Sequence, residues 1–342
     1  EFVKDELLIG VRPGTTYERF QGLLDEIGGM IVEADAATGI YLVRFPSGTN
    51  IEALLQQIAR HPFIARAELN YVTRLPAGVS SARTAAAAYP VPNPPADGSL
   101  PVAVLDSGLD PAAGLSPLVS AGWDAMNPGQ ALSDPAGHGT QMALLASGVL
   151  SADGLSPAGD VLPLVPVRAF DEEGKTSNFA IFQALAYAAE AGAKVINMSW
   201  GSETDSEFMR TAMQVAAARG LTLVAAAGNS PTGKPMYPAA YPDVIAVAAV
   251  TSDGSPWNQS NHGGFVDLAA PATATFPSGS FVGTSISSAT VAGALARYLN
   301  QNPGTTATAA LNALHQALSP APGEGYGRGV LDAAALQRFL HP

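Results

Sequence analysis

The chain has 342 residues, of which 47% are hydrophobic and 13% charged, and this composition is typical of a soluble protein with a large buried core. Its net charge of −12 at pH 7 would repel a phosphate backbone, so we expect no nucleic-acid partner. The lack of cysteine excludes disulfides, thiolate metal sites and cysteine nucleophiles. No apolar run reaches the roughly 18 residues of a membrane span, so we expect no membrane partner either.

Residues 1–75 are predicted to form a small domain of the α+β class. Two capping boxes, Thr15 to Glu18 and Thr49 to Glu52, mark the starts of two helices. Short apolar segments bounded by turn residues predict strands around them. In chain order the predicted elements are a strand at 6–12, a helix to about 27, strands at 30–36 and 40–45, a helix to about 60 and a strand at 64–72. This order is typical of the ferredoxin-like fold, which by itself indicates no function.

Residues 76–99 have the composition of a linker. Residues 82–88 include few side chains that could pack, and the proline-rich segment from Tyr89 to Pro95 favours an extended backbone. We expect this linker to be exposed and open to proteolysis.

Residues 100–342 are predicted to form a second, larger domain. Short apolar strands alternate with segments in which apolar residues recur at helical spacing. This alternation is typical of a doubly wound α/β fold, in which a mainly parallel sheet has helices on both faces. The predicted strands are 102–106, 161–167, 195–199, 221–226 and 244–250, and the predicted helices are 139–149, 179–191, 206–219 and 285–300. In such sheets the active site forms at the carboxyl ends of the strands.

Four polar residues stand at strand ends or helix starts and together meet the needs of nucleophilic catalysis. Ser285 is a candidate nucleophile, His138 a base that takes its proton, and Asp106 a carboxylate that orients the base. Asn229 can supply an amide donor to an oxyanion. Taken singly, each residue has a structural interpretation, as a turn residue or a helix cap. Their joint presence favours the catalytic interpretation.

The sequence resembles the subtilisin-like serine proteases over about residues 100–335. The resemblance rests on five motifs in the order of that family, namely Val-Ala-Val-Leu-Asp106-Ser-Gly, His138-Gly-Thr, Asn197-Met-Ser-Trp-Gly, Ala-Ala-Gly228-Asn229 and Gly283-Thr-Ser285. Residues 1–75 resemble the propeptide of the family, which is an inhibitor and folding assistant. The resemblance implies a catalytic triad of Asp106, His138 and Ser285. It also implies an oxyanion hole made by the Asn229 side chain and the Ser285 backbone N–H.

A few positions depart from the family pattern. Gln141 stands where a second histidine is common, Ile286 replaces the usual methionine, and Ala289-Thr290 replaces a Pro-His pair. None of these positions supplies a proton or an oxyanion donor. We therefore expect the departures to affect packing and substrate fit more than activity.

The resemblance also implies where a substrate binds. An extended peptide would add between two backbone edges, one at residues 174–178 and the other made by Ser199, Trp200 and Gly201. Ala226 and Gly228 would line the first specificity pocket, with Met236 at its base. Because many relatives have glycine in place of this methionine, we expect a shallow pocket that prefers small or medium apolar residues.

The resemblance implies no required cofactor and no metal in catalysis. Four acidic residues could ligate calcium, as in many relatives, but their spacing matches no calcium-binding loop and we expect them to be solvated. They are Asp110, Asp134, Asp153 and Asp160.

We further expect the protein to be a monomer that is secreted or periplasmic. The resemblance also implies a cis peptide bond between Tyr237 and Pro238.

The resemblance also implies that the last strand of residues 1–75 continues into a tail that occupies the active-site cleft like a substrate and is cut by the enzyme itself. Counting on from Tyr71-Val72 assigns residues 73–76 to the cleft and the expected cut to the bond between Pro76 and Ala77. Proline lacks an N–H and fits poorly before a cut. We therefore expect slow self-processing, displaced into residues 77–88 or left to another protease, after which the propeptide stays bound through two surfaces.

The sequence thus predicts a serine endopeptidase made as a zymogen, with protein or peptide substrates and with residues 1–75 as its own inhibitor. A catalytically idle protein that keeps the fold for binding or as a scaffold is the alternative hypothesis. An esterase that uses the same residues is a third. The presence of all four catalytic residue types disfavours the idle protein.

Overall fold

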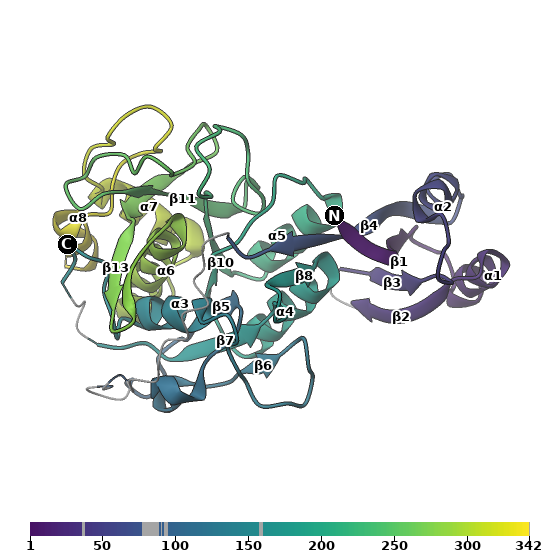
Figure 1. Cartoon of the computed structure of the whole chain (residues 1–342), viewed down its shortest axis with the longest axis horizontal. Helices are drawn as coiled ribbons and strands as arrows, with labels where there is room; N and C mark the ends of the chain where they lie inside the picture. The colour runs from purple at the N-terminus through teal and green to yellow at the C-terminus, as the bar shows by residue number, and fades with distance from the viewer. Residues whose placement is uncertain (36–37, 77–88, 90, 92–94, 157–159, 342) are drawn as a thin grey trace.

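The computed structural model describes residues 1–35, 38–76, 89, 91, 95–156 and 160–341. Figure 1 shows a small sheet, built from the first strands of the chain, at one end of the molecule and a larger region of strands and helices beside it. Among these residues, no helix combines the length and the apolar character that crossing a membrane requires. The predicted fold class, a doubly wound α/β sheet preceded by a small α+β domain, is confirmed.

The N-terminal domain has the predicted ferredoxin-like order. Its elements are β1 (Phe2–Val11), α1 (Tyr17–Ile27), β2 (Met30–Asp35), β3 (Ile40–Arg44), α2 (Ile51–Ile58) and β4 (Ile64–Arg74). The strands pair antiparallel in the order β2-β3-β1-β4. The helix caps are Thr16 and Asn50, each one residue later than the predicted boxes, because these side chains accept the N–H groups of Arg19 and Ala53.

The larger domain is built on a parallel sheet whose strand order, in the described part of the chain, is β12-β11-β10-β9-β5-β7-β6. These strands are β5 (Val102–Asp106), β6 (Trp123–Asp124), β7 (Leu164–Arg168), β9 (Val195–Met198), β10 (Thr222–Ala226), β11 (Val244–Val250) and β12 (Leu268–Pro271). The α-helices are α3 (His138–Ser147), α4 (Asn178–Glu190), α5 (Glu207–Ala218), α6 (Thr284–Gln301), α7 (Ala307–Ala317) and α8 (Ala333–Leu340). Smaller elements are β8 (Lys175–Ser177), the hairpin of β13 (Thr273–Phe276) and β14 (Gly279–Val282), and two short 3-10 helices, Pro111–Ala113 and Ser116–Leu118. Every predicted strand and helix of this domain is present, with ends within three residues of the prediction.

The sheet of the larger domain has helices on both faces, which is why most residues of its strands are apolar. Val102 and Val104 of β5 belong to a core with α3 and α6. Ala103 and Leu105, which point to the opposite face, belong to a core with α4 and α5. The two helices whose first turns hold the predicted base and nucleophile, α3 and α6, therefore lie on the same face of the sheet.

The N-terminal sheet also uses both of its faces. Leu7 and Ile9 of β1 pack with α1 and α2, which Figure 1 shows at the end of the molecule away from the larger domain. Leu8 of the same strand, with Ile40 and Leu42 of β3, joins the core around α4 and α5. The small domain is thus packed onto the two helices through an apolar face.

Part of the predicted linker is anchored rather than exposed. The N–H of Tyr89 donates to the carbonyl of Ala113 at 3.0 Å, and both Tyr89 and Val91 are half-buried against the core of the larger domain. The predicted processing region, residues 77–88, lies outside the described residues.

Candidate active site

The four predicted catalytic residues come from elements that meet at one edge of the parallel sheet. Asp106 is the last residue of β5, and Asn229 follows β10 by three residues. His138 is the first residue of α3, and Ser285 is the second of α6. Because the carboxyl ends of parallel strands lie at the same edge, the loops that follow them meet there. His138, Asn229 and Ser285 line one cavity of about 370 Å³.

Asp106 and His138 form a buried pair. The His138 Nδ1 atom lies 2.7 Å from Asp106 Oδ1, which also accepts the N–H of Ser107 at 2.7 Å. Burial lowers the pKa of His138, but the charge and hydrogen bond of Asp106, together with the charge of Asp134, outweigh burial and leave this pKa raised. The surroundings therefore favour the imidazolium form that a general base acquires when it takes a proton.

Glycine at position 139 allows α3 to approach the loop that follows β5. A Cβ atom on Gly139 would lie 2.3 Å from the carbonyl oxygen of Gly108, too close for any side chain. Across this contact the Gly139 N–H donates to Ser107 Oγ at 2.8 Å. The glycine of the His-Gly-Thr motif thus helps to bring His138 within hydrogen-bonding distance of Asp106.

The Ser285 hydroxyl is bound to the backbone. Its Oγ donates to the Ser199 carbonyl at 3.3 Å. Among the hydrogen bonds of the described residues, none joins Ser285 to His138, although both side chains line the same cavity. The hydrogen bond between nucleophile and base therefore stays a prediction, and such bonds are often long until a substrate binds.

The Asn229 amide has a defined orientation. Its Oδ1 atom accepts the backbone N–H of Thr284 at 3.0 Å and the hydroxyl of Thr284 at 2.8 Å. These two bonds hold the oxygen, and among the described residues no hydrogen bond is made by the NH₂ group of the amide. Asn229 also lines the cavity with Ser285, so this NH₂ group is available to an oxyanion formed there.

The last strand of the N-terminal domain extends into the larger domain and ends at this cavity. Residues 72–74 pair antiparallel with β8, and the last of them also forms an antiparallel bridge with Gly201. The N–H of Leu75 donates to the carbonyl of Gly174 at 2.9 Å. Pro76 lines the cavity itself. The tail therefore lies between the two backbone edges that were predicted to hold a substrate.

The side chains of Ser199 and Trp200 are buried. The Ser199 hydroxyl lies 2.9 Å from that of Ser288 in α6, and Trp200 donates its indole N–H to the carbonyl of Leu105 at 2.9 Å. This segment therefore meets the tail through its backbone, at Gly201, and not through these two side chains.

Met236 lies beside the glycines of the predicted specificity pocket. A Cβ atom on Gly201 would lie 2.8 Å from Met236 Cγ, and one on Gly228 would lie 3.0 Å from Met236 Cε. Ala226 is buried at the end of β10. The peptide bond between Tyr237 and Pro238 is cis, as predicted. Met236 is therefore close to both glycines, and its role at the base of a specificity pocket stays a prediction.

Two side chains of β4, missed by the sequence analysis, hold the N-termini of α4 and α5. Glu68 accepts the N–H of Glu207 at 2.9 Å and the hydroxyl of Ser206, the cap of α5. Asn70 accepts the N–H of Phe179, in the first turn of α4, at 3.3 Å. These N–H groups have no acceptor within their own helices. The one available signal was a row of three polar residues at alternate positions of the strand, Arg66, Glu68 and Asn70, which lie on the same face.

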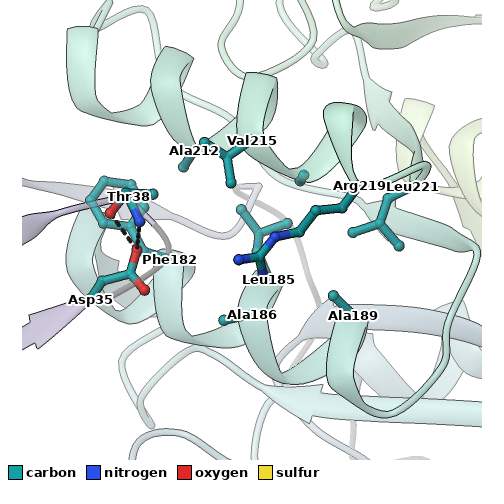
Figure 2. Close-up of a pocket in the computed structure, with 11 residues that line it drawn as sticks. Asp35, Thr38, Phe182, Leu185, Ala186, Ala189, Ala212, Val215, Arg219 and Leu221 are labelled. Atoms are coloured by element: carbon teal, nitrogen blue, oxygen red, sulfur yellow. Dashed lines mark hydrogen bonds between the residues drawn. The ribbon is translucent and has the colours of Figure 1, made fainter.

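The turn between β2 and β3 makes a further contact with the same helices. Figure 2 shows Asp35 and Thr38 at one end of a small cleft whose other residues come from α4, α5 and the turn between α5 and β10. The Thr38 N–H donates to Asp35 Oδ2 at 3.0 Å. The N-terminal domain therefore contacts the outer helices at its turn as well as along β4.

Three of the four acidic residues that were expected to be solvated also bind backbone N–H groups. The carboxylates of Asp110, Asp134 and Asp153 accept the backbone N–H groups of Ala112, Thr140 and Thr275 at 2.9, 2.7 and 3.1 Å. Each caps a backbone segment whose N–H groups would otherwise lack an acceptor.

Two family descriptions match the chain. The Subtilase family matches residues 98–329, and the fervidolysin N-terminal prodomain matches residues 1–70. The first match alone covers more than half of the chain. It includes all four candidate catalytic residues.

Similar proteins support the same assignment. The chain is 32% identical to thermitase of Thermoactinomyces vulgaris over 200 residues, which are 56% of this chain and 72% of thermitase. It is 31% identical to subtilisin Savinase of Lederbergia lenta over 245 residues, 69% of this chain and 90% of that protein. Fervidolysin from Fervidobacterium pennivorans, described as a keratinolytic enzyme related to subtilisin, has the same fold with a TM-score of 0.73 at 20% identity. That comparison covers 98% of this chain and 61% of the fervidolysin chain. The chain therefore belongs to the subtilase family and carries a fervidolysin-like prodomain at its N-terminal end.

Proposed function

We propose that this chain is the precursor of a serine endopeptidase that its own prodomain inhibits. The observation that carries the proposal is the position of the tail, which is paired between β8 and Gly201 and ends with Pro76 in the cavity of His138 and Ser285. A peptide held as an added strand in front of a nucleophile is arranged as a substrate. We assign residues 1–75 to the prodomain, 76–99 to a linker and 100–342 to the catalytic domain.

In the proposed reaction Ser285 Oγ attacks the carbonyl carbon of the scissile bond, and His138 takes the hydroxyl proton. Asp106 orients His138 and stabilises its imidazolium form. The C–N bond then breaks as His138 gives the proton to the leaving amine, and a water molecule hydrolyses the acyl-enzyme by the same steps in reverse. The Asn229 amide and the Ser285 N–H stabilise the oxyanion, helped by the positive N-terminal end of α6.

We also propose that the enzyme acts as a secreted or periplasmic monomer on proteins or peptides. Every step of the proposed reaction uses a side chain or backbone group of the chain itself, so we propose no required cofactor. The apolar contact between the N-terminal sheet and the core around α4 and α5 supports a prodomain that stays bound after the tail is cut.

The experiment that tests the proposal uses the processed protein, with the prodomain removed, and its Ser285→Ala variant. We expect the unaltered enzyme to digest casein and to react with a fluorophosphonate probe at Ser285, and the variant to do neither. No label and no digestion would favour the idle binding protein. Turnover of esters without digestion of casein would favour the esterase.

Met236 is expected to set the preference at the cleaved position. Met236→Gly removes the side chain that lies against Gly201 and Gly228 and should deepen the pocket. We expect its kcat/KM for peptides with Phe or Tyr before the cut to rise roughly tenfold relative to peptides with Ala. The control is Lys234→Gly, an exposed position two residues away. An unchanged ratio in Met236→Gly would remove this residue from the pocket.

Pro76 is expected to slow self-processing. Arg74 forms an antiparallel bridge with Gly201. In the same register, Pro76, which follows Arg74 by two residues, lies opposite Ser199, which precedes Gly201 by two. A residue with an N–H could donate it to the Ser199 carbonyl, but proline cannot, and this carbonyl accepts the Ser285 hydroxyl. An N–H at position 76 would compete for the carbonyl and free the hydroxyl for His138.

We therefore expect the full chain to process itself slowly and Pro76→Ala to be cut after residue 76 roughly fivefold faster or more. Intact mass and N-terminal sequencing during incubation of the purified protein measure both the rate and the site. Leu75→Ala keeps the N–H that donates to Gly174 and should not be accelerated. Rapid and complete cutting after Pro76 in the unaltered chain would contradict the argument.

A further inference from the structure

Asp134 lies four residues before His138 and binds the first turn of α3. Its Oδ1 atom accepts the N–H of Gly137 at 2.8 Å, and its Oδ2 atom accepts both the N–H and the hydroxyl of Thr140 at 2.7 and 2.6 Å. The residue in the N-cap position is Gly137, which has no side chain for this purpose and a φ of 78°. A carboxylate from outside the helix therefore does the work of the missing cap.

The same turn is bound to the loop that follows Asp106. The Thr140 hydroxyl, which donates to Asp134, also accepts the N–H of Asp110 at 2.9 Å. The hydrogen bond from the Gly139 N–H to Ser107 Oγ is a second connection between the two segments. A shift of this turn would thus change the position of the base relative to the carboxylate that orients it.

The charge of Asp134 also acts on His138. A histidine at a helix N-terminus faces the positive end of the helix dipole, which disfavours its imidazolium form, and burial disfavours it further. Among the described residues, the charged groups that favour the imidazolium form are Asp106 and Asp134. Arg168 lies opposite Asp106 on the neighbouring strand, and its positive charge is paired with the carboxylate of Asp124 at 2.9 Å.

We propose that Asp134 is a positioning residue of the active site, whose carboxylate fixes the first turn of α3 against the loop after Asp106 and stabilises the imidazolium form of His138. The inference rests on the proposed function, because it assigns His138 the role of general base. It gives Asp134 two effects that can be separated, one from hydrogen bonds and one from charge.

The pH dependence of kcat/KM separates these effects. His138 must be neutral to take the proton of Ser285, so activity is lost as the pH falls through the pKa of His138, which its surroundings raise. Asp134→Asn removes the charge but keeps one acceptor oxygen. We expect the acid limb of its pH profile, where kcat/KM falls as His138 becomes protonated, to move to lower pH. On the plateau above this limb we expect kcat/KM to fall roughly threefold to tenfold, because the imidazolium formed in the transition state is less stable.

Two variants serve as comparisons. Asp134→Glu keeps the charge and disturbs the hydrogen bonds, so its plateau should fall while its acid limb stays with that of the parent enzyme. Asp110→Asn removes a carboxylate from the same region, one that caps Ala112 and has no part in the His138 pair, and its profile should match the parent. If Asp134→Asn does not fold, an acid limb that moves to lower pH in Asp134→Glu would still contradict the proposal.

An NMR titration of His138 in the Ser285→Ala background gives a readout that needs no turnover. We expect the measured pKa of His138 to fall on adding Asp134→Asn and to stay unchanged on adding Asp110→Asn. An unchanged pKa in the first case, or an equal fall in both, would overturn the role of Asp134. An inactive parent enzyme in which Asp134→Asn still lowers this pKa would instead overturn the proposed function and leave the electrostatic role of Asp134 intact.

Discussion

Ser285→Ala is expected to lower kcat by about 10⁶, the size of the loss that the same change causes in subtilisin, a member of the same family. Ser285 supplies the atom that attacks the peptide carbonyl, and alanine has no group to replace it. The variant cannot cut its own tail, so its prodomain has to be removed with an added protease before kcat is measured on a chromogenic peptide. Ser280→Ala, at an exposed serine of β14, is the matched control and should keep its activity.

His138→Ala should cost nearly as much, and the double variant should be little worse than either single one, because the two residues act as a unit. This pattern distinguishes a triad from two independent contributions, whose losses would multiply. Losses that multiply, or a Ser285→Ala enzyme that retains ordinary turnover, would contradict the assignment of nucleophile and base.

The sequence was sufficient to choose the four candidate catalytic residues because each stands at or near the end of an element, where local signals are strong. Asp106 closes an apolar strand, His138 directly follows a glycine at a helix start, and Ser285 is the second residue after one. Hydrophobic periodicity predicted the strands and helices between them, because a sheet covered on both faces needs apolar residues at nearly every strand position. Short segments of sequence are therefore enough to predict where an element ends and which of its faces is buried.

Contacts between distant segments could not be predicted in the same way. Glu68 and Asn70 have ordinary sequence neighbours, and their role depends on helices that begin more than 100 residues later in the chain. Such roles follow from packing, which a single sequence does not specify. Asp134, by contrast, binds residues three and six positions later, and the glycine at position 137 was a local signal that the sequence analysis did not use.

Asn229→Ala is expected to lower kcat by roughly 10² to 10³ with little change in KM, the effect of losing the corresponding donor in subtilisin. The two hydrogen bonds from Thr284 hold Oδ1, so the NH₂ group is already oriented before a substrate binds and costs no reorganisation when charge develops on the oxyanion. Asn229→Asp keeps the acceptor for Thr284 but replaces the donor with a negative charge, so it should be slower still. Steady-state kinetics of the processed enzymes on one peptide substrate measure both variants. An Asn229→Ala enzyme that works at the full rate would remove Asn229 from the oxyanion hole, whereas a loss confined to KM would make it a substrate-binding residue only.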